Sequence, residues 1–225
     1  MTRRALLIHG LSSNSTTWWR VAAALETEGW QVITPDLRGH GSAPRAESYA
    51  IADYASDLPA GPWDLVVGHS LGGAVAVLAA RSASRLVLLD PVLEVAPDEF
   101  DEIEADQLAE LDLTIESIRV AKPHWHPRDH ELKAAAVQQA DPRAVERTFR
   151  DNPDWNVVDA AAALTMPTLI LGGDHRVYSM LSTETADAVV AANPKVTYRV
   201  IEGSGHSLHR DRPDETIAAI LDFVA

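Results

Sequence analysis

A serine on a sharp turn is the feature of this sequence that most directly predicts chemistry. Residues 68–73 read Gly-His-Ser-Leu-Gly-Gly; they follow the apolar run Asp64–Val67 and open the Ala- and Val-rich stretch Leu71–Ser82. A strand that turns at once into a helix raises the serine hydroxyl above the sheet, and the flanking glycines let strand and helix approach closely. The helix N-terminus also offers backbone N–H groups to an oxyanion. Ser70 is therefore the predicted nucleophile.

A general base for such a serine is expected late in the chain, after the last strand, if the order is serine, acid, histidine. The segment Gly203-Ser204-Gly205-His206 follows the apolar run Val196–Ile201. His206 is the predicted base. His209 competes with it but lacks the glycine-rich setting, and we interpret it as a helix-entry or surface histidine.

Two more motifs precede the serine: His-Gly-Leu at 9–11 and Asp-Leu-Arg-Gly-His-Gly at 36–41. Together with the serine turn, a late acid and His206, they give the sequence a resemblance to the α/β-hydrolase family that covers nearly the whole chain. The resemblance implies that the N–H groups of Leu11 and Leu71 form an oxyanion hole. Three histidines inside these motifs are interpreted as shaping loops rather than transferring protons: His9, His40 and His69.

The third member of the expected catalytic set is a carboxylate, and the family usually places it just after the strand predicted at Thr168–Leu171. Asp174 is the only carboxylate in that loop, although its spacing from Gly172 is shorter than the common pattern. Asp90, at the end of the run Arg85–Leu89 and directly before a proline, is the alternative. We predict Asp174.

Short apolar runs alternate with amphipathic stretches, a pattern typical of a parallel, doubly wound α/β sheet. Residues 94–155 interrupt it with a segment that is helical in pattern and strongly acidic at its start. We therefore predict a hydrolase core at 1–93 and 156–225 and a helical cap insertion at 94–155. Two strands that normally precede the His9 strand in the family are missing, so the strand at Gln31–Thr34 is expected at or near a sheet edge. An exposed edge strand offers backbone groups that a second copy could pair with. The predicted state is a monomer or a homodimer.

Histidines cluster inside the predicted cap, in the segment His124-Trp125-His126-Pro127-Arg128-Asp129-His130. The spacing departs from known zinc-ligand runs, and ligands from elsewhere in the fold are needed for such a site. We predict no metal, and we expect His124 and Trp125 to line the substrate pocket.

The composition of the chain limits the classes of partner that it is expected to bind. The chain has 225 residues, no cysteine and a formal net charge of −14. This acidity disfavours nucleic acid and anionic membranes as partners, because both need positive surface. No run reaches the roughly 18 apolar residues that span a bilayer. A small-molecule substrate, no cofactor and a cytoplasmic location are expected.

These observations predict a serine hydrolase that cleaves a small or medium carboxylic ester. The same residues would serve a C–C bond, amide or lactone hydrolase, or a cofactor-free perhydrolase. A non-catalytic small-molecule receptor of this fold is a different class, and a reactive-serine probe separates the two.

Overall fold

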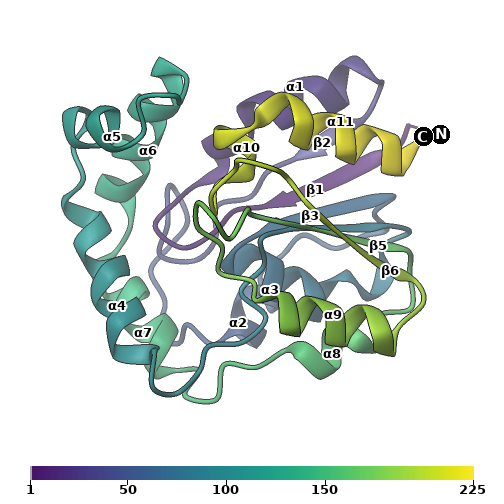
Figure 1. Ribbon diagram of the computed structural model, residues 1–225. Coiled ribbons are helices and arrows are strands. Elements are labelled where there is room, and N and C mark those ends of the chain that lie inside the picture. Colours follow the sequence, from purple (N-terminus) through teal and green to yellow (C-terminus); the bar gives the residue numbers. More distant parts are fainter. Residues whose placement is uncertain (1) are drawn as a thin grey trace.

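The computed structural model describes residues 2–225 and shows a sheet between two layers of helices (Figure 1). The sheet order is β2-β1-β3-β4-β5-β6, and every neighbouring pair is parallel. The fold is therefore the predicted doubly wound α/β type. The strands have the following bounds: β1 Arg4–Ile8, β2 Gln31–Ile33, β3 Leu65–His69, β4 Leu86–Leu89, β5 Thr168–Gly172 and β6 Val196–Val200.

Strand β2 lies at one edge of the sheet, as the sequence predicted, and β6 lies at the other. The inner strands β1, β3, β4 and β5 are almost entirely buried, as expected for strands covered on both faces. The edge strand β6 alternates between buried and more exposed residues instead. The serine turn leaves β3, so its position is fixed by the best-buried part of the sheet.

Alternate residues of the strands pack against different helix layers. Leu7, Val67 and Leu89 belong to one apolar cluster with α1 (Trp19–Thr27) and α11 (Pro213–Val224). Leu6 and Val66 belong to another, with helices of the opposite face. The remaining core helices are α2 Ile51–Ser56, α3 Leu71–Ala79, α8 Val158–Ala162, α9 Thr183–Ala192 and α10 Leu208–Asp211, with short 3₁₀ turns η1 Ser15–Trp18 and η2 Ala80–Ser82.

Helix α9 begins at Thr183. Ser182 caps it, since its hydroxyl accepts the Thr185 N–H. The residues before Ser182 make other contacts, because the Ser179 hydroxyl and the Met180 N–H donate to Asp90.

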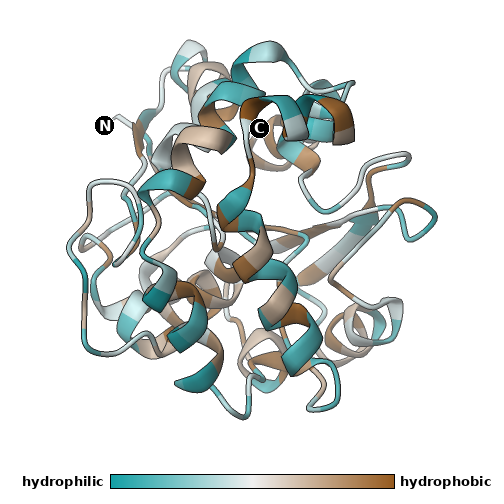
Figure 2. Ribbon diagram, turned by 90° about the vertical axis from the view of Figure 1, so that its left-hand side faces the viewer, coloured by the Kyte–Doolittle hydropathy of each residue, from teal (hydrophilic) through white to brown (hydrophobic). Residues whose placement is uncertain are grey.

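The segment between β4 and β5 folds into helices beyond the carboxyl edge of the sheet, on the left of Figure 1. They are α4 Phe100–Ala109, η3 Glu110–Asp112, α5 Ile115–Ala121, α6 Pro127–Gln139 and α7 Pro142–Arg150. We call them the cap helices. Figure 2, which looks onto this side, shows hydrophilic and hydrophobic residues interspersed along them.

The two ends of this segment meet. Glu94 and Asn156 form an antiparallel bridge, and the Val95 N–H donates to the Trp155 carbonyl at 3.0 Å. The chain therefore leaves the core and returns to it at one point.

None of the helices within residues 2–225 is long and apolar enough to cross a membrane.

Candidate active site

Ser70 occupies a strained turn between β3 and α3. Its φ is +56° and its ψ is −123°, a conformation that L residues rarely adopt. The turn is possible because strand and helix nearly touch: a Cβ on Gly68 would lie 2.3 Å from the Gly72 carbonyl oxygen. A Cβ on Gly72 would lie as close, 2.3 Å, to the Ile8 carbonyl oxygen. Gly68 and Gly72 are therefore required by packing.

His206 follows β6 and reaches toward the carboxyl end of β4. Its Nδ1 lies 2.6 Å from Oδ2 of Asp90. The carboxylate fixes the ring with a proton on Nδ1, which leaves Nε2 as the nitrogen that can accept a proton. His206 and Ser70 line the same pocket.

Asp90 is fully buried and accepts four hydrogen bonds. Its Oδ1 accepts from the Gly173 N–H at 3.0 Å and the Ser179 hydroxyl at 2.6 Å, and its Oδ2 accepts from the Met180 N–H at 2.8 Å as well as from His206. Burial alone would raise the pKa of this carboxyl, but the hydrogen bonds and charge of His206, with the Gly173 and Ser179 donors, lower it overall. Asp90 is thus held as a carboxylate.

The expectation that Asp174 contacts His206 is wrong. Both Asp174 oxygens bond instead to the guanidinium of Arg176, at 3.0 and 2.8 Å, and Oδ2 also accepts the Gly203 N–H at 2.9 Å. These donors, the Arg176 side chain first, hold the pKa of Asp174 well below its usual range. Asp174 ties the loop after β5 to the loop that carries His206, and the shortened spacing noted in the sequence places it there.

Leu11 and Leu71 line the same pocket, and among residues 2–225 neither backbone N–H donates to another backbone or side-chain group. His9 orients the first of them. Its Nδ1–H donates to the Gly10 carbonyl at 2.8 Å, and its Nε2 accepts the Leu37 N–H at 2.9 Å. In a trans peptide the C=O and N–H point in opposite directions, so fixing the Gly10 carbonyl also fixes the direction of the Leu11 N–H.

The other histidines of the motifs are buried and neutral. Burial, with the proximity of the His40 ring as a smaller cause, lowers the pKa of His9 to about 3. Burial also holds the pKa of His69 well below its usual value, and the Nε2–H of His69 donates to the His206 carbonyl at 2.9 Å. These contacts match the loop-shaping roles expected for these side chains.

His209 is the second residue of α10, as a helix-entry residue would be, but it is not a surface residue. It is 2% exposed, and its Nε2 lies 2.7 Å from the Thr17 hydroxyl. Its contact is therefore with the loop after β1, not with Ser70 or Asp90.

The pocket between Ser70 and the cap has a volume of about 350 Å³. Its walls are mainly apolar, with four polar side chains on the cap side. The lining residues beyond Ser70, His206, Leu11 and Leu71 are Val92, Val95, Ile103, Asp106, Gln107, Glu110, Lys122, Phe149, Trp155, Tyr178 and Met180.

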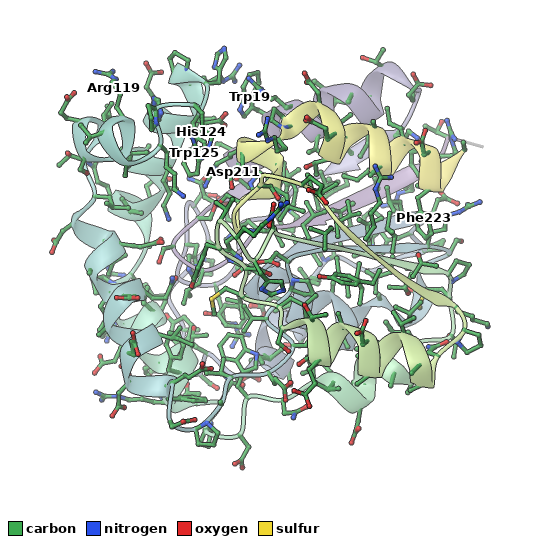
Figure 3. All side chains as sticks on the ribbon, in the orientation of Figure 1. Trp19, Arg119, His124, Trp125, Asp211 and Phe223 are labelled. Carbon is green, nitrogen blue, oxygen red and sulfur yellow. The ribbon has the colours of Figure 1, made fainter. Side chains whose placement is uncertain are left out.

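His124 and Trp125 do not line this pocket, contrary to expectation. Both donate to Oδ1 of Asp211, His124 from Nε2 at 2.9 Å and Trp125 from its indole N–H at 2.6 Å. The second oxygen of Asp211 accepts the Gly205 N–H at 2.9 Å. Figure 3 shows the three side chains together where the cap meets α10. Asp211, which the sequence analysis did not single out, joins the cap to the residue before His206.

The remaining side chains of the cap histidine segment have separate partners. Asp129 accepts the Trp19 indole N–H at 2.8 Å, and His130 bonds to the Lys122 carbonyl at 2.8 Å. No group of three or more His, Asp or Glu side chains within residues 2–225 is placed to hold a metal ion.

The chain is similar to several proteins named as esterases or hydrolases. A "putative esterase/lipase" of Haemophilus influenzae is 26% identical, over 97% of this chain and 82% of that protein. An esterase from Exiguobacterium antarcticum has the same fold, with a TM-score of 0.81 at 19% identity, covering 99% of this chain and 91% of that one. E-2-(acetamidomethylene)succinate hydrolase superposes with a TM-score of 0.80 at 25% identity, covering 99% and 91%. The family model described as the alpha/beta hydrolase family matches residues 5–219, and this chain is accordingly a member of the α/β-hydrolase family.

Proposed function

We propose that the protein is a serine hydrolase that cleaves small or medium, uncharged carboxylic esters. One observation carries the proposal: Ser70, on its strained turn, shares an apolar pocket with a histidine whose Nδ1 is held by the buried Asp90. This combination supplies a nucleophile, a base and a group that orients the base.

The roles are assigned from the placement of these residues around one pocket and from the His206–Asp90 hydrogen bond. His206 Nε2 removes the Ser70 proton while Oγ attacks the ester carbonyl. The N–H groups of Leu11 and Leu71 bind the oxyanion, and Asp90 stabilises the imidazolium that forms. His206 then protonates the leaving alcohol. In the second half of the cycle it activates water, which releases the acid and restores Ser70.

The lining of the pocket supports an uncharged substrate. Its cap wall carries Asp106 and Glu110, whereas Lys122 is the one cationic side chain among the lining residues. Glu110 is also paired with the buried Lys133 of α6, which leaves Asp106 and Lys122 of opposite sign. The wall therefore offers no surplus of positive charge to a substrate with two carboxylates, such as the succinate derivative named for the third protein compared above. The apolar remainder, including Phe149 and Trp155, suits an acyl chain or a ring.

A fluorophosphonate probe, with the labelled peptide located by mass spectrometry, tests the nucleophile. We expect label on Ser70 alone, and turnover of p-nitrophenyl esters that varies with acyl length. Ser70→Ala should reduce turnover to a few per cent or less. The control Ser84→Ala, which changes an exposed serine of the α/β-hydrolase domain, should leave turnover unchanged. Label elsewhere, or an active Ser70→Ala variant, contradicts the proposal. An unlabelled Ser70 with tight binding of a small apolar ligand would indicate a receptor instead.

A further inference from the structure

A lysine of the cap reaches the loop that carries the Leu11 amide. Lys133 lies on α6 and is only 7% exposed. Its ammonium group donates to the Ser12 carbonyl at 3.1 Å and to Oε2 of Glu110 at 2.5 Å. Burying a cation costs several kcal/mol unless it is paired, so a lysine at this place needs both partners.

The loop that Lys133 holds is strained. Ser12 is fully buried and has a φ of +52°, in the left-handed region that L residues occupy at a cost. Such a conformation persists only where its surroundings enforce it. The cap supplies a second hold on the same loop, because the Asn14 side-chain amide donates to Oε1 of Gln139 at 2.9 Å.

Glu110 connects this hold to the substrate pocket. It lines the pocket on the cap side and, at the same time, neutralises Lys133. A continuous path of hydrogen bonds therefore runs from the pocket wall through Lys133 to Ser12, the residue that follows Leu11.

We propose that Lys133 is a positioning residue for the oxyanion-binding amide of Leu11, with Glu110 as the partner that keeps it charged. The inference rests on the proposed function. His9 fixes the Gly10–Leu11 peptide from the core side, and Lys133 fixes the next turn from the cap side. Without Lys133 the left-handed Ser12 relaxes, and the Leu11 N–H no longer points at the position of the oxyanion.

Three variants test this role. Lys133→Met removes the donor. Lys133→Met/Glu110→Leu removes donor and partner together, so that no unpaired charge stays buried and the fold is retained. Arg119→Met is the matched control, because it removes a cap cation whose partner is Glu116, outside the pocket and the loop. In Figure 3 the Arg119 side chain lies at the outer end of the cap.

The readouts are kcat for a p-nitrophenyl ester and two inhibition constants. Phenylboronic acid forms a tetrahedral adduct with the serine and uses the oxyanion site, whereas benzyl alcohol fills the pocket without an adduct. Loss of one oxyanion donor costs about 10²–10³-fold, so misplacing it should lower kcat by about 10- to 100-fold. The inhibition constant of phenylboronic acid should rise by a similar factor in both Lys133 variants, whereas that of benzyl alcohol should change by no more than about twofold. In Arg119→Met, kcat and both inhibition constants should be unchanged.

A Lys133 variant that keeps its kcat, or that loses kcat without weaker phenylboronic acid binding, overturns the inference. Where the single variant does not fold, the double variant decides. A wild-type protein that neither hydrolyses esters nor binds phenylboronic acid contradicts the proposed function itself, and the two failures are thereby distinguished.

Discussion

Asp90 accepts four hydrogen bonds at once, so the replacement of a single carboxylate oxygen should affect catalysis. In Asp90→Asn one oxygen becomes an NH₂ group, and the His206 ring loses the charged acceptor that selects its tautomer. We expect kcat for ester hydrolysis to fall by about 10⁴-fold, because the imidazole is then held with the wrong nitrogen protonated. Steady-state kinetics with one p-nitrophenyl ester measures this.

Asp174→Asn is the matched comparison. Its carboxylate contacts Arg176 and Gly203 rather than His206, so the change should lower the melting temperature and leave kcat within a few fold of wild type. If Asp174→Asn instead loses the large factor and Asp90→Asn remains active, the assignment of the acid made here is wrong.

Some of these residues could be predicted from sequence and others could not. Ser70 and His206 sit in local patterns whose spacing reflects local geometry. The partners of Asp90 lie 83–116 residues away along the chain, so no local pattern distinguishes it from Asp174. His124 and Trp125 were misplaced for the same reason, since Asp211 is 86–87 residues distant. The sequence does contain an indication of Lys133, because a charged residue there lies on the same helix face as the apolar Ala134 and Val137, which are buried in α6.

At the level of elements, Asp36 joins the loop after β2 to the loop after β1. It accepts the Ser15 N–H at 2.7 Å and both the N–H and hydroxyl of Ser42 at 2.8 Å. Burial by itself would raise the pKa of Asp36, but these hydrogen bonds lower it to about 2. A carboxyl with a depressed folded-state pKa contributes stability above its unfolded pKa of about 3.9, and that stability is lost as the pH falls toward the folded value.

Asp36→Asn should therefore destabilise the protein by about 1–3 kcal/mol at pH 7, since hydrogen bonds to a charged group are replaced. The difference in melting temperature from wild type should shrink between about pH 4 and pH 2. Thermal unfolding of both proteins across that range measures it. A difference that stays constant through this window would show that the charge of Asp36 is not what holds the loops.

The cap is tied to the core through a buried carboxylate, Asp211. Trp125→Phe keeps an aromatic ring but removes the N–H that donates to it. We expect a loss of about 1.5–3 kcal/mol in the free energy of unfolding, measured with urea.

Trp63→Phe provides the reference, because the Trp63 indole donates to the neutral Pro59 carbonyl at 3.2 Å and is equally buried. Its loss should be about 1 kcal/mol. Equal losses in the two variants would mean that the charge of Asp211 adds nothing to the attachment of the cap.

At the scale of the whole molecule, charge should select substrates. The net charge of −14 repels anions, and the cap wall of the pocket carries no surplus of positive charge to offset this repulsion. We expect kcat/KM for an ester with a terminal carboxylate on its acyl chain to be lower than for a matched neutral ester. It should rise as salt is added, because screening at 0.15 M acts over about 8 Å. The neutral ester should show little salt dependence, and the same response of both esters would contradict this field effect.

The pairing of Glu94 with Asn156 has a consequence for exchange of parts between related proteins. Because the chain leaves and re-enters the core through paired residues, everything between them is a single loop closed by that pairing. The entropic cost of closing a loop grows only slowly with its length, so a foreign insertion of another length can be grafted there at little cost. Such modularity is incomplete, since the native segment also delivers Lys133 to the Ser12 carbonyl. A transplanted cap that folds well but brings no donor to that carbonyl should yield a chimera that binds its new substrates and turns them over slowly.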